Sequence, residues 1–141
     1  MTEKEVDLLL KQFKGHVNGL MNCEDELVDI KYQLRGVKKS KSKSISDEAQ
    51  PDGTKIYKNT VISLEEKLLQ VRKERNYHLF AVRLVMNMLK TLGNDEIELL
   101  ELYYWDELSL KAVSKRNKFK YDISTISRRI NSILEKMQMF A

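Results

Sequence analysis

A seven-residue apolar repeat occurs twice in this chain, and it restricts the possible folds more than any other feature. Apolar side chains alternate at spacings of three and four through residues 6–37 and again through residues 61–92. The seam positions are Val6, Leu9, Phe13, His16, Leu20, Cys23, Leu27, Ile30, Leu34 and Val37, then Val61, Leu64, Leu68, Val71, Arg75, His78, Val82, Val85, Leu89 and Leu92. A helix with such a seam must bury it against another helix. The sequence therefore predicts an all-α protein with a long, antiparallel, coiled-coil-like hairpin.

Two polar residues on the second seam, Arg75 and His78, predict the register of this hairpin. The ends of the two seams match when facing positions have numbers that sum to about 98. Arg75 then lies near Cys23 and beside the carboxylates of residues 24–26. His78 lies near Leu20. We expect a partly buried polar layer here, which would fix the register as a buried polar residue does in a coiled coil.

Two segments depart from the repeat. Gly15 and Gly19 lie about one turn apart in the first helix, where they either admit a close neighbour or produce a kink. Residues 38–59 alternate lysine with serine and then become rich in turn-forming residues. Because this segment has too little apolar surface to offset the entropy of ordering, it is predicted to be a flexible loop. Residues 1–92 would then form a two-helix hairpin around this loop.

The second long helix is predicted from Thr60 to Leu92 with a stop at Gly93, and it carries more apolar residues than one partner helix covers. Its off-seam apolar residues are Leu69, Leu79, Phe80, Leu84, Met86 and Met88. They require cover from the C-terminal region or from a second protomer. We therefore expect a homodimer, and the sequence leaves open whether the long helices pair within one chain or between chains.

Residues 93–141 are predicted to form a separate domain that opens with a bracing helix. Asp95 is expected to begin this helix, with Glu98 at the capping-box position. Trp105 follows near a turn, where the sequence favours packing in the core over a place at an interface. The helix would support the segment that follows it.

Two helices joined by a turn complete this domain. Ser109 suits the N-cap of the first helix, and Asp122 suits the N-cap of the second. The second helix, residues 122–137, has five apolar side chains predicted to be buried on one face: Ile123, Ile126, Ile130, Ile133 and Met137. The polar side chains left outside are of types that reach phosphates or base edges. This arrangement is typical of a helix-turn-helix DNA reader.

Positively and negatively charged residues lie in separate segments of this domain. Residues 109–131 hold seven cations and one anion, whereas residues 93–108 hold six anions and no cation. A basic surface facing a polyanion would explain this division, and a helical domain with dipolar surface charge is the alternative. The residues expected to contact double-stranded DNA are Lys111, Arg116, Lys118, Lys120, Ser124, Thr125, Ser127, Arg128, Arg129 and Asn131. Arg128 and Ser124 are assigned to bases, and Arg129 mainly to phosphates.

Three runs of residues in this region resemble a known DNA-binding fold. They are Leu102-Tyr103-Tyr104, Leu108 to Ser114, and Ser124 to Ile130 followed by Leu134. These runs are similar to region 4 of sigma-70-type factors, in particular to the phage-encoded form in ArpU/RinA-type late transcriptional regulators. The resemblance implies that the third run opens a recognition helix in the major groove of promoter-like DNA. It also implies a phage or prophage origin, late-gene control and RNA polymerase as a candidate partner.

Other classes of protein find little support. A single cysteine, Cys23, excludes an internal disulfide and fits a reducing cytoplasm, and no apolar run has the length of a membrane span or a signal core. No cluster of cysteine and histidine has metal spacing, and there is no glycine-rich phosphate loop. We therefore expect a cytoplasmic protein that is not an enzyme and needs no metal or cofactor. A small terminase-like subunit that recognises viral DNA and a coiled-coil interaction protein remain alternatives, and the residues favour neither activation nor repression.

Overall fold

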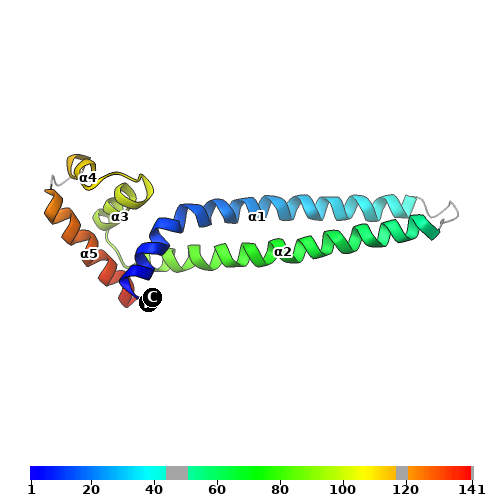
Figure 1. Cartoon of the computed structure of the whole chain (residues 1–141), viewed down its shortest axis with the longest axis horizontal. Helices are drawn as coiled ribbons and strands as arrows, with labels where there is room; N and C mark the ends of the chain where they lie inside the picture. The colour runs from blue at the N-terminus through cyan, green and yellow to red at the C-terminus, as the bar shows by residue number, and fades with distance from the viewer. Residues whose placement is uncertain (44–50, 117–120, 141) are drawn as a thin grey trace. The chain divides into compact units, whose positions relative to one another are not determined.

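The computed structural model describes residues 1–43, 51–116 and 121–140, most of which are helical. In chain order these are α1 (Glu3–Lys43), α2 (Pro51–Leu89), α3 (Asn94–Leu100), the π-helix η1 (Glu101–Trp105), α4 (Leu110–Arg116) and α5 (Ile123–Met139) (Figure 1). No strand occurs in this described part of the chain, so the predicted all-α class is confirmed. Within the same residues, no helix combines the length and the hydropathy of a membrane span.

The chain divides by packing into two compact units. The hairpin unit comprises residues 18–79, and the terminal unit comprises residues 1–17 together with residues 80–141. The sequence-based division after residue 92 places the start of α1 and the end of α2 in the hairpin. In the structure these two segments belong to the terminal unit, because their apolar side chains complete its core.

In the hairpin unit, α1 and α2 lie side by side and run in opposite directions (Figure 1). The core of this unit consists of the buried residues Cys23, Leu27, Ile30, Leu34 and Val71, with Val61, Leu64 and Leu68 packed against them. Every one of these is a predicted seam position. The antiparallel pairing of the two long helices is therefore confirmed, and both belong to one chain.

The predicted register and polar layer are also present. The Arg75 Nη1 atom lies 3.8 Å from Glu24 Oε1, and the Nε atom of the same arginine is buried with no hydrogen-bond partner among the described residues. The His78 ring packs over Gly19, where a Cβ atom would lie only 2.5 Å from His78 Nε2. A Cβ atom at Gly15 would meet nothing within 4 Å. Of the two glycines, only Gly19 therefore admits a close neighbour.

The predicted loop at residues 38–59 is wrong at both ends. α1 continues through Lys43, and α2 already begins at Pro51, whereas residues 44–50 lie outside the described part of the chain. Extending an existing helix adds a hydrogen bond for each residue that is fixed, and lysine has a high helix propensity. Proline suits the first position of a helix, because its missing N–H would be unpaired there in any case.

The core of the terminal unit draws on both ends of the chain. Its buried residues are Val6, Leu10, Val85, Met88, Leu92, Leu99, Leu100, Tyr104, Val113, Ile126, Ile130, Ile133, Leu134 and Met137. Met88, one of the off-seam residues that require cover, is fully buried here, and Leu84 packs against the same core. Leu69, Phe80 and Met86 are left 58%, 71% and 52% exposed. Met88 and Leu84 are therefore covered within the chain and do not require a second protomer.

The start of α1 is fastened to η1 by polar contacts. The Tyr104 hydroxyl donates a hydrogen bond of 2.5 Å to Asp7 Oδ1, and Lys11 pairs with the other carboxylate oxygen at 3.0 Å. The Trp105 indole N–H donates to the Leu10 carbonyl at 3.2 Å. Burial, together with the hydrogen bond to Asp7, raises the pKa of Tyr104 well above its ordinary value. Trp105 also packs against the core of the terminal unit, as predicted.

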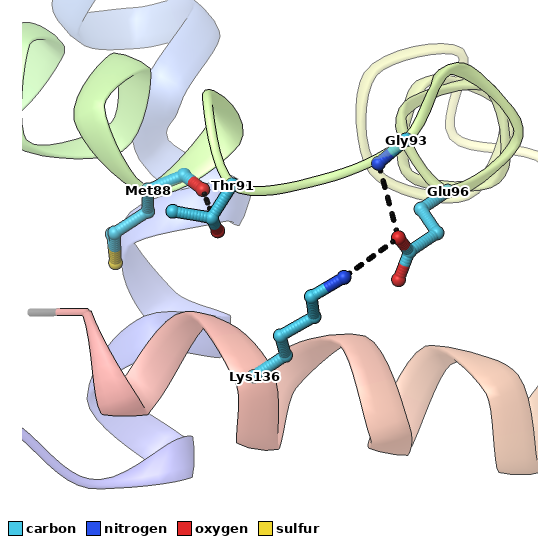
Figure 2. A network of polar contacts seen from close by, with 5 residues as sticks. All are labelled: Met88, Thr91, Gly93, Glu96 and Lys136. Atoms are coloured by element: carbon cyan, nitrogen blue, oxygen red, sulfur yellow. Dashed lines mark hydrogen bonds and ion pairs between the residues drawn. The ribbon is translucent and has the colours of Figure 1, made fainter.

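Figure 2 shows the polar network around the link between α2 and α3. The Thr91 hydroxyl donates to the Met88 carbonyl at 2.7 Å as α2 ends. Glu96 Oε1 accepts a hydrogen bond from the Gly93 N–H at 3.0 Å and another from Lys136 Nζ at 3.1 Å. One carboxylate oxygen thus caps α3 and connects it to α5.

This network corrects the predicted capping box of Asp95 and Glu98. Gly93 is the N-cap of α3 and not the C-terminal stop of α2, and because glycine has no side chain, only the returning half of a capping box forms. Glu96 is the residue that reaches back, since it also meets Lys136 of α5. Burial by itself raises the pKa of Glu96, but the hydrogen bonds from Gly93 and Lys136 outweigh it and lower the pKa overall.

Candidate nucleic-acid interface

α4 begins where the sequence predicts. The Ser109 hydroxyl accepts a hydrogen bond from the Ala112 N–H at 3.2 Å, which caps the helix. Val113 is fully buried one turn later, and Leu108 packs against the same apolar core. The helix spans Leu110–Arg116 in the described part of the chain. α4 is therefore fixed to the terminal unit by one apolar side, and its other side chains lie outside that core.

α5 is capped by Asp122 as predicted. The Asp122 carboxylate accepts a hydrogen bond of 2.8 Å from the Thr125 N–H. This contact with Thr125, with a smaller contribution from the positive charge of Arg128, lowers the pKa of Asp122. The helix runs two residues beyond the predicted end at Met137.

The buried face of α5 matches the prediction at all but one position. Ile126, Ile130, Ile133 and Met137 are buried, and Leu134 joins them. Ile123 is 45% exposed, so its predicted burial is wrong. The apolar core reaches α5 only from Ile126 onward, which leaves the first turn of the helix outside it.

Three of the predicted contact residues form a stripe along the outside of α5. Ser124, Arg128 and Asn131 are spaced by four and three residues, and all three are exposed. At about 100° per residue, these positions point away from the buried face. Arg128 Nε donates a long hydrogen bond of 3.4 Å to the Ser124 carbonyl. Thr125 and Ser127 lie at the flanks of the stripe, where they are half-buried.

Arg129 is held apart from this stripe by an aromatic ring. Its guanidinium carbon lies 4.2 Å from the centroid of the Tyr121 ring, which itself packs against the apolar core. The Ser114 hydroxyl donates to the Tyr121 carbonyl at 2.7 Å and so ties the entry of α5 to α4. Tyr121 is not among the predicted site residues. The alternation of cations and aromatic residues before α5 was the signal that could have indicated its role.

The remaining predicted cations have different outcomes. Lys111 and Arg116 are exposed on α4, as is Lys115. Lys118 and Lys120 lie outside the described residues. The ion pairs found within the described part of the chain use none of the cations of α4. These charges are therefore available to a polyanion.

The acidic segment that precedes α4 is exposed as well. Asp95, Glu98, Glu101, Asp106 and Glu107 all have exposed side chains, whereas Glu96 is engaged by Lys136. Among the described residues, no group of three or more histidine, cysteine, aspartate or glutamate side chains is placed to hold a metal ion. The arrangement on α4 and α5 suits binding to an anionic partner through hydrogen-bond donors and positive charge.

No family model matches the chain, and no curated protein or solved structure matches it either.

Proposed function

We propose that this chain is a sequence-specific DNA-binding transcriptional regulator whose α4 and α5 form a helix-turn-helix. The observation that carries the proposal is the exposed stripe of Ser124, Arg128 and Asn131 on α5, opposite a face that is buried in the core. Side chains of these types read base edges in the major groove. The resemblance of this region to sigma-70 region 4 of phage late regulators supports the same assignment.

Each residue type of the stripe suits a different base contact. Arginine pairs with the two acceptors of guanine, asparagine pairs with adenine, and serine pairs with either. Arg128 and Asn131 would therefore carry most of the sequence discrimination. Thr125 and Ser127, which are half-buried at the flanks, would contact both bases and phosphates. Arg129 would contact a phosphate while the Tyr121 ring fixes its position.

The charges on α4 and α5 indicate which part of the proposed helix-turn-helix would face DNA. Lys111, Lys115 and Arg116 on α4 are exposed cations that would meet the phosphate backbone. Glu135 continues the stripe of α5 but lies 11 residues beyond Ser124, about 16 Å along the helix axis. Only the first half of α5 would therefore face bases, with Glu135 outside the groove.

Selection from random DNA duplexes at physiological salt tests the proposal. The wild type should enrich one motif, and Arg128→Ala should relax one position of that motif at a cost of about 1–3 kcal/mol in binding. Arg83→Ala is the matched control, because it removes an exposed arginine from α2 and leaves α4 and α5 intact. It should leave the motif unchanged.

Two results would contradict the proposal. One is binding by the wild type without any enriched motif, which would make the basic surface a nonspecific electrostatic feature. The other is an unchanged motif with Arg128→Ala, which would remove Arg128 from the bases. RNA polymerase is the further proposed partner, and co-sedimentation of the polymerase with the DNA-bound protein would test it.

A further inference from the structure

The two helices of the hairpin unit carry the same four-residue pattern on their outer surfaces. The pattern is an apolar residue, a glutamate, an apolar residue and a cation, at successive spacings of three, four and three. It is formed by Met21, Glu24, Val28 and Lys31 on α1, and by Ile62, Glu65, Leu69 and Arg72 on α2. We call these eight residues the repeat face.

All eight side chains are exposed in the isolated chain. The four apolar ones, Met21, Val28, Ile62 and Leu69, are 61%, 65%, 52% and 58% exposed. Scattered exposed apolar residues are common, but a regular set on two adjacent helices indicates a surface that another molecule covers.

The repeat face lies on one side of the hairpin. Met21 and Val28 each follow a seam residue by one position, and Ile62 and Leu69 do the same on α2. Because the two helices are antiparallel, side chains at these equivalent positions project to the same side of the pair. The other side carries mainly exposed polar side chains: Asn22, Glu26, Asp29, Gln33, Ser63, Lys67, Gln70 and Glu74. The exposed apolar residues are thus concentrated on one side, apart from Tyr77 and Tyr32, which are exposed elsewhere on the hairpin.

The order of the charges indicates what covers this side. On both helices the glutamate precedes the cation along the chain. When two such helices from different molecules meet in antiparallel fashion, each glutamate faces a cation across an apolar contact. The surface is therefore complementary to itself.

We infer that a second copy of this chain packs on the repeat face and forms a homodimer through the hairpin unit. When the two-fold axis is parallel to the hairpin, α1 of one copy lies against α2 of the other. The same residue positions then face each other between the copies as within one chain. Val28 of one copy then lies opposite Leu69 of the other. Glu24 faces Arg72 of the second copy, and Lys31 faces Glu65.

The side chain of Glu24 has the freedom that this arrangement requires. Its contact with Arg75 of the same chain is long, at 3.8 Å, and the side chain remains 56% exposed. It can therefore accept a closer cation from a second copy. None of the eight residues belongs to α4 or α5, so the dimer does not depend on the proposed DNA-binding activity.

Sedimentation equilibrium of the full chain at micromolar concentration tests the inference. The wild type should have the mass of a dimer. The double substitution Val28→Glu and Leu69→Glu should yield a monomer, with the dissociation constant raised at least about 100-fold, because buried carboxylates would lack partners. Both positions are more than half exposed, so far-ultraviolet circular dichroism should show unchanged helix content.

Tyr77→Glu is the control, because it places the same charge on the opposite side of the hairpin at a residue that is 64% exposed. It should remain dimeric. Lys31→Glu should weaken the dimer, and adding Glu65→Lys to it should restore most of the affinity. A monomeric wild type would assign the face to another protein and overturn the inference, as would a dimer that survives Val28→Glu and Leu69→Glu. A double charge reversal that stays as weak as Lys31→Glu would overturn the proposed pairing of the charges.

Discussion

The hairpin unit and the terminal unit bury their apolar residues in different ways. The hairpin unit uses one seam on each of two helices, and its core residues are all members of a regular repeat. The terminal unit joins residues from the first three turns of α1, the end of α2 and every later helix. A repeat within one helix can be read directly from the sequence, whereas a core assembled from both chain ends cannot. The hairpin unit is therefore the more predictable of the two.

The largest difference in stability is expected when a leucine is replaced by alanine in each of the two cores. Leu100→Ala, at a position that is 0% exposed in the terminal unit, should lower the free energy of unfolding by about 2–5 kcal/mol. Leu27→Ala in the hairpin unit should lower the free energy of unfolding by less. Two packed helices can shift to fill a cavity more readily than a core that is surrounded by several helices. Urea denaturation of both variants measures the difference. Equal losses, or the reverse order, would refute this account of the two cores.

A second contrast lies within α1, between two glycines. Gly19→Ala should destabilise the protein by about 1–3 kcal/mol, because the new methyl group overlaps the His78 ring. Gly15→Ala meets open space and should instead stabilise the helix by about 0.5–1 kcal/mol. Thermal unfolding of the two variants gives the comparison. Two stabilising substitutions would mean that the close approach at Gly19 is absent in solution.

The contact between the start of α1 and η1 should make a smaller contribution to the free energy of unfolding. Tyr104→Phe removes the hydrogen bond to Asp7 and should lower stability by about 1–2 kcal/mol, because it leaves a partly buried carboxylate with one partner fewer. Tyr32→Phe, at a side chain that is 78% exposed, is the control and should have no effect. Hydrogen exchange should locate the loss in residues 1–17. A change in hydrogen exchange that is confined to the hairpin unit would mean that the Tyr104–Asp7 hydrogen bond does not hold the start of α1 in place.

The smallest effect is expected at the cap of α3. Glu96→Gln should cost less than about 1 kcal/mol at neutral pH, since its partner Lys136 is partly exposed. The folded-state pKa of Glu96 is lowered, so its contribution is present above the unfolded-state pKa and is lost as the pH falls through the folded-state value. The wild type should therefore lose stability in acid more steeply than Glu96→Gln. Glu98→Gln, an exposed position on the same helix, should follow the wild-type curve, and parallel curves for all three proteins would contradict the prediction.

The candidate interface divides in a similar way. The caps at Ser109 and Asp122 and the outward stripe of α5 follow from residue type and helical spacing, so the sequence predicts them. The position of Arg129 on the Tyr121 ring and the exposure of Ile123 do not follow from spacing. They depend on where the apolar core ends beneath the first turn of α5. Helical periodicity gives the direction of a side chain, but it does not give the extent of the surface that covers it.

The sequence by itself determined the helical class, the antiparallel pairing in the hairpin unit and the polar layer of Arg75 and Glu24, because each rests on periodicity within one or two helices. The tertiary structure alone decided that the start of α1 belongs to the terminal unit. It also decided that Glu96 and not Glu98 completes the cap of α3. These features depend on contacts between residues far apart in the chain, such as Tyr104 with Asp7 and Glu96 with Lys136, and local propensity carries no information about such partners.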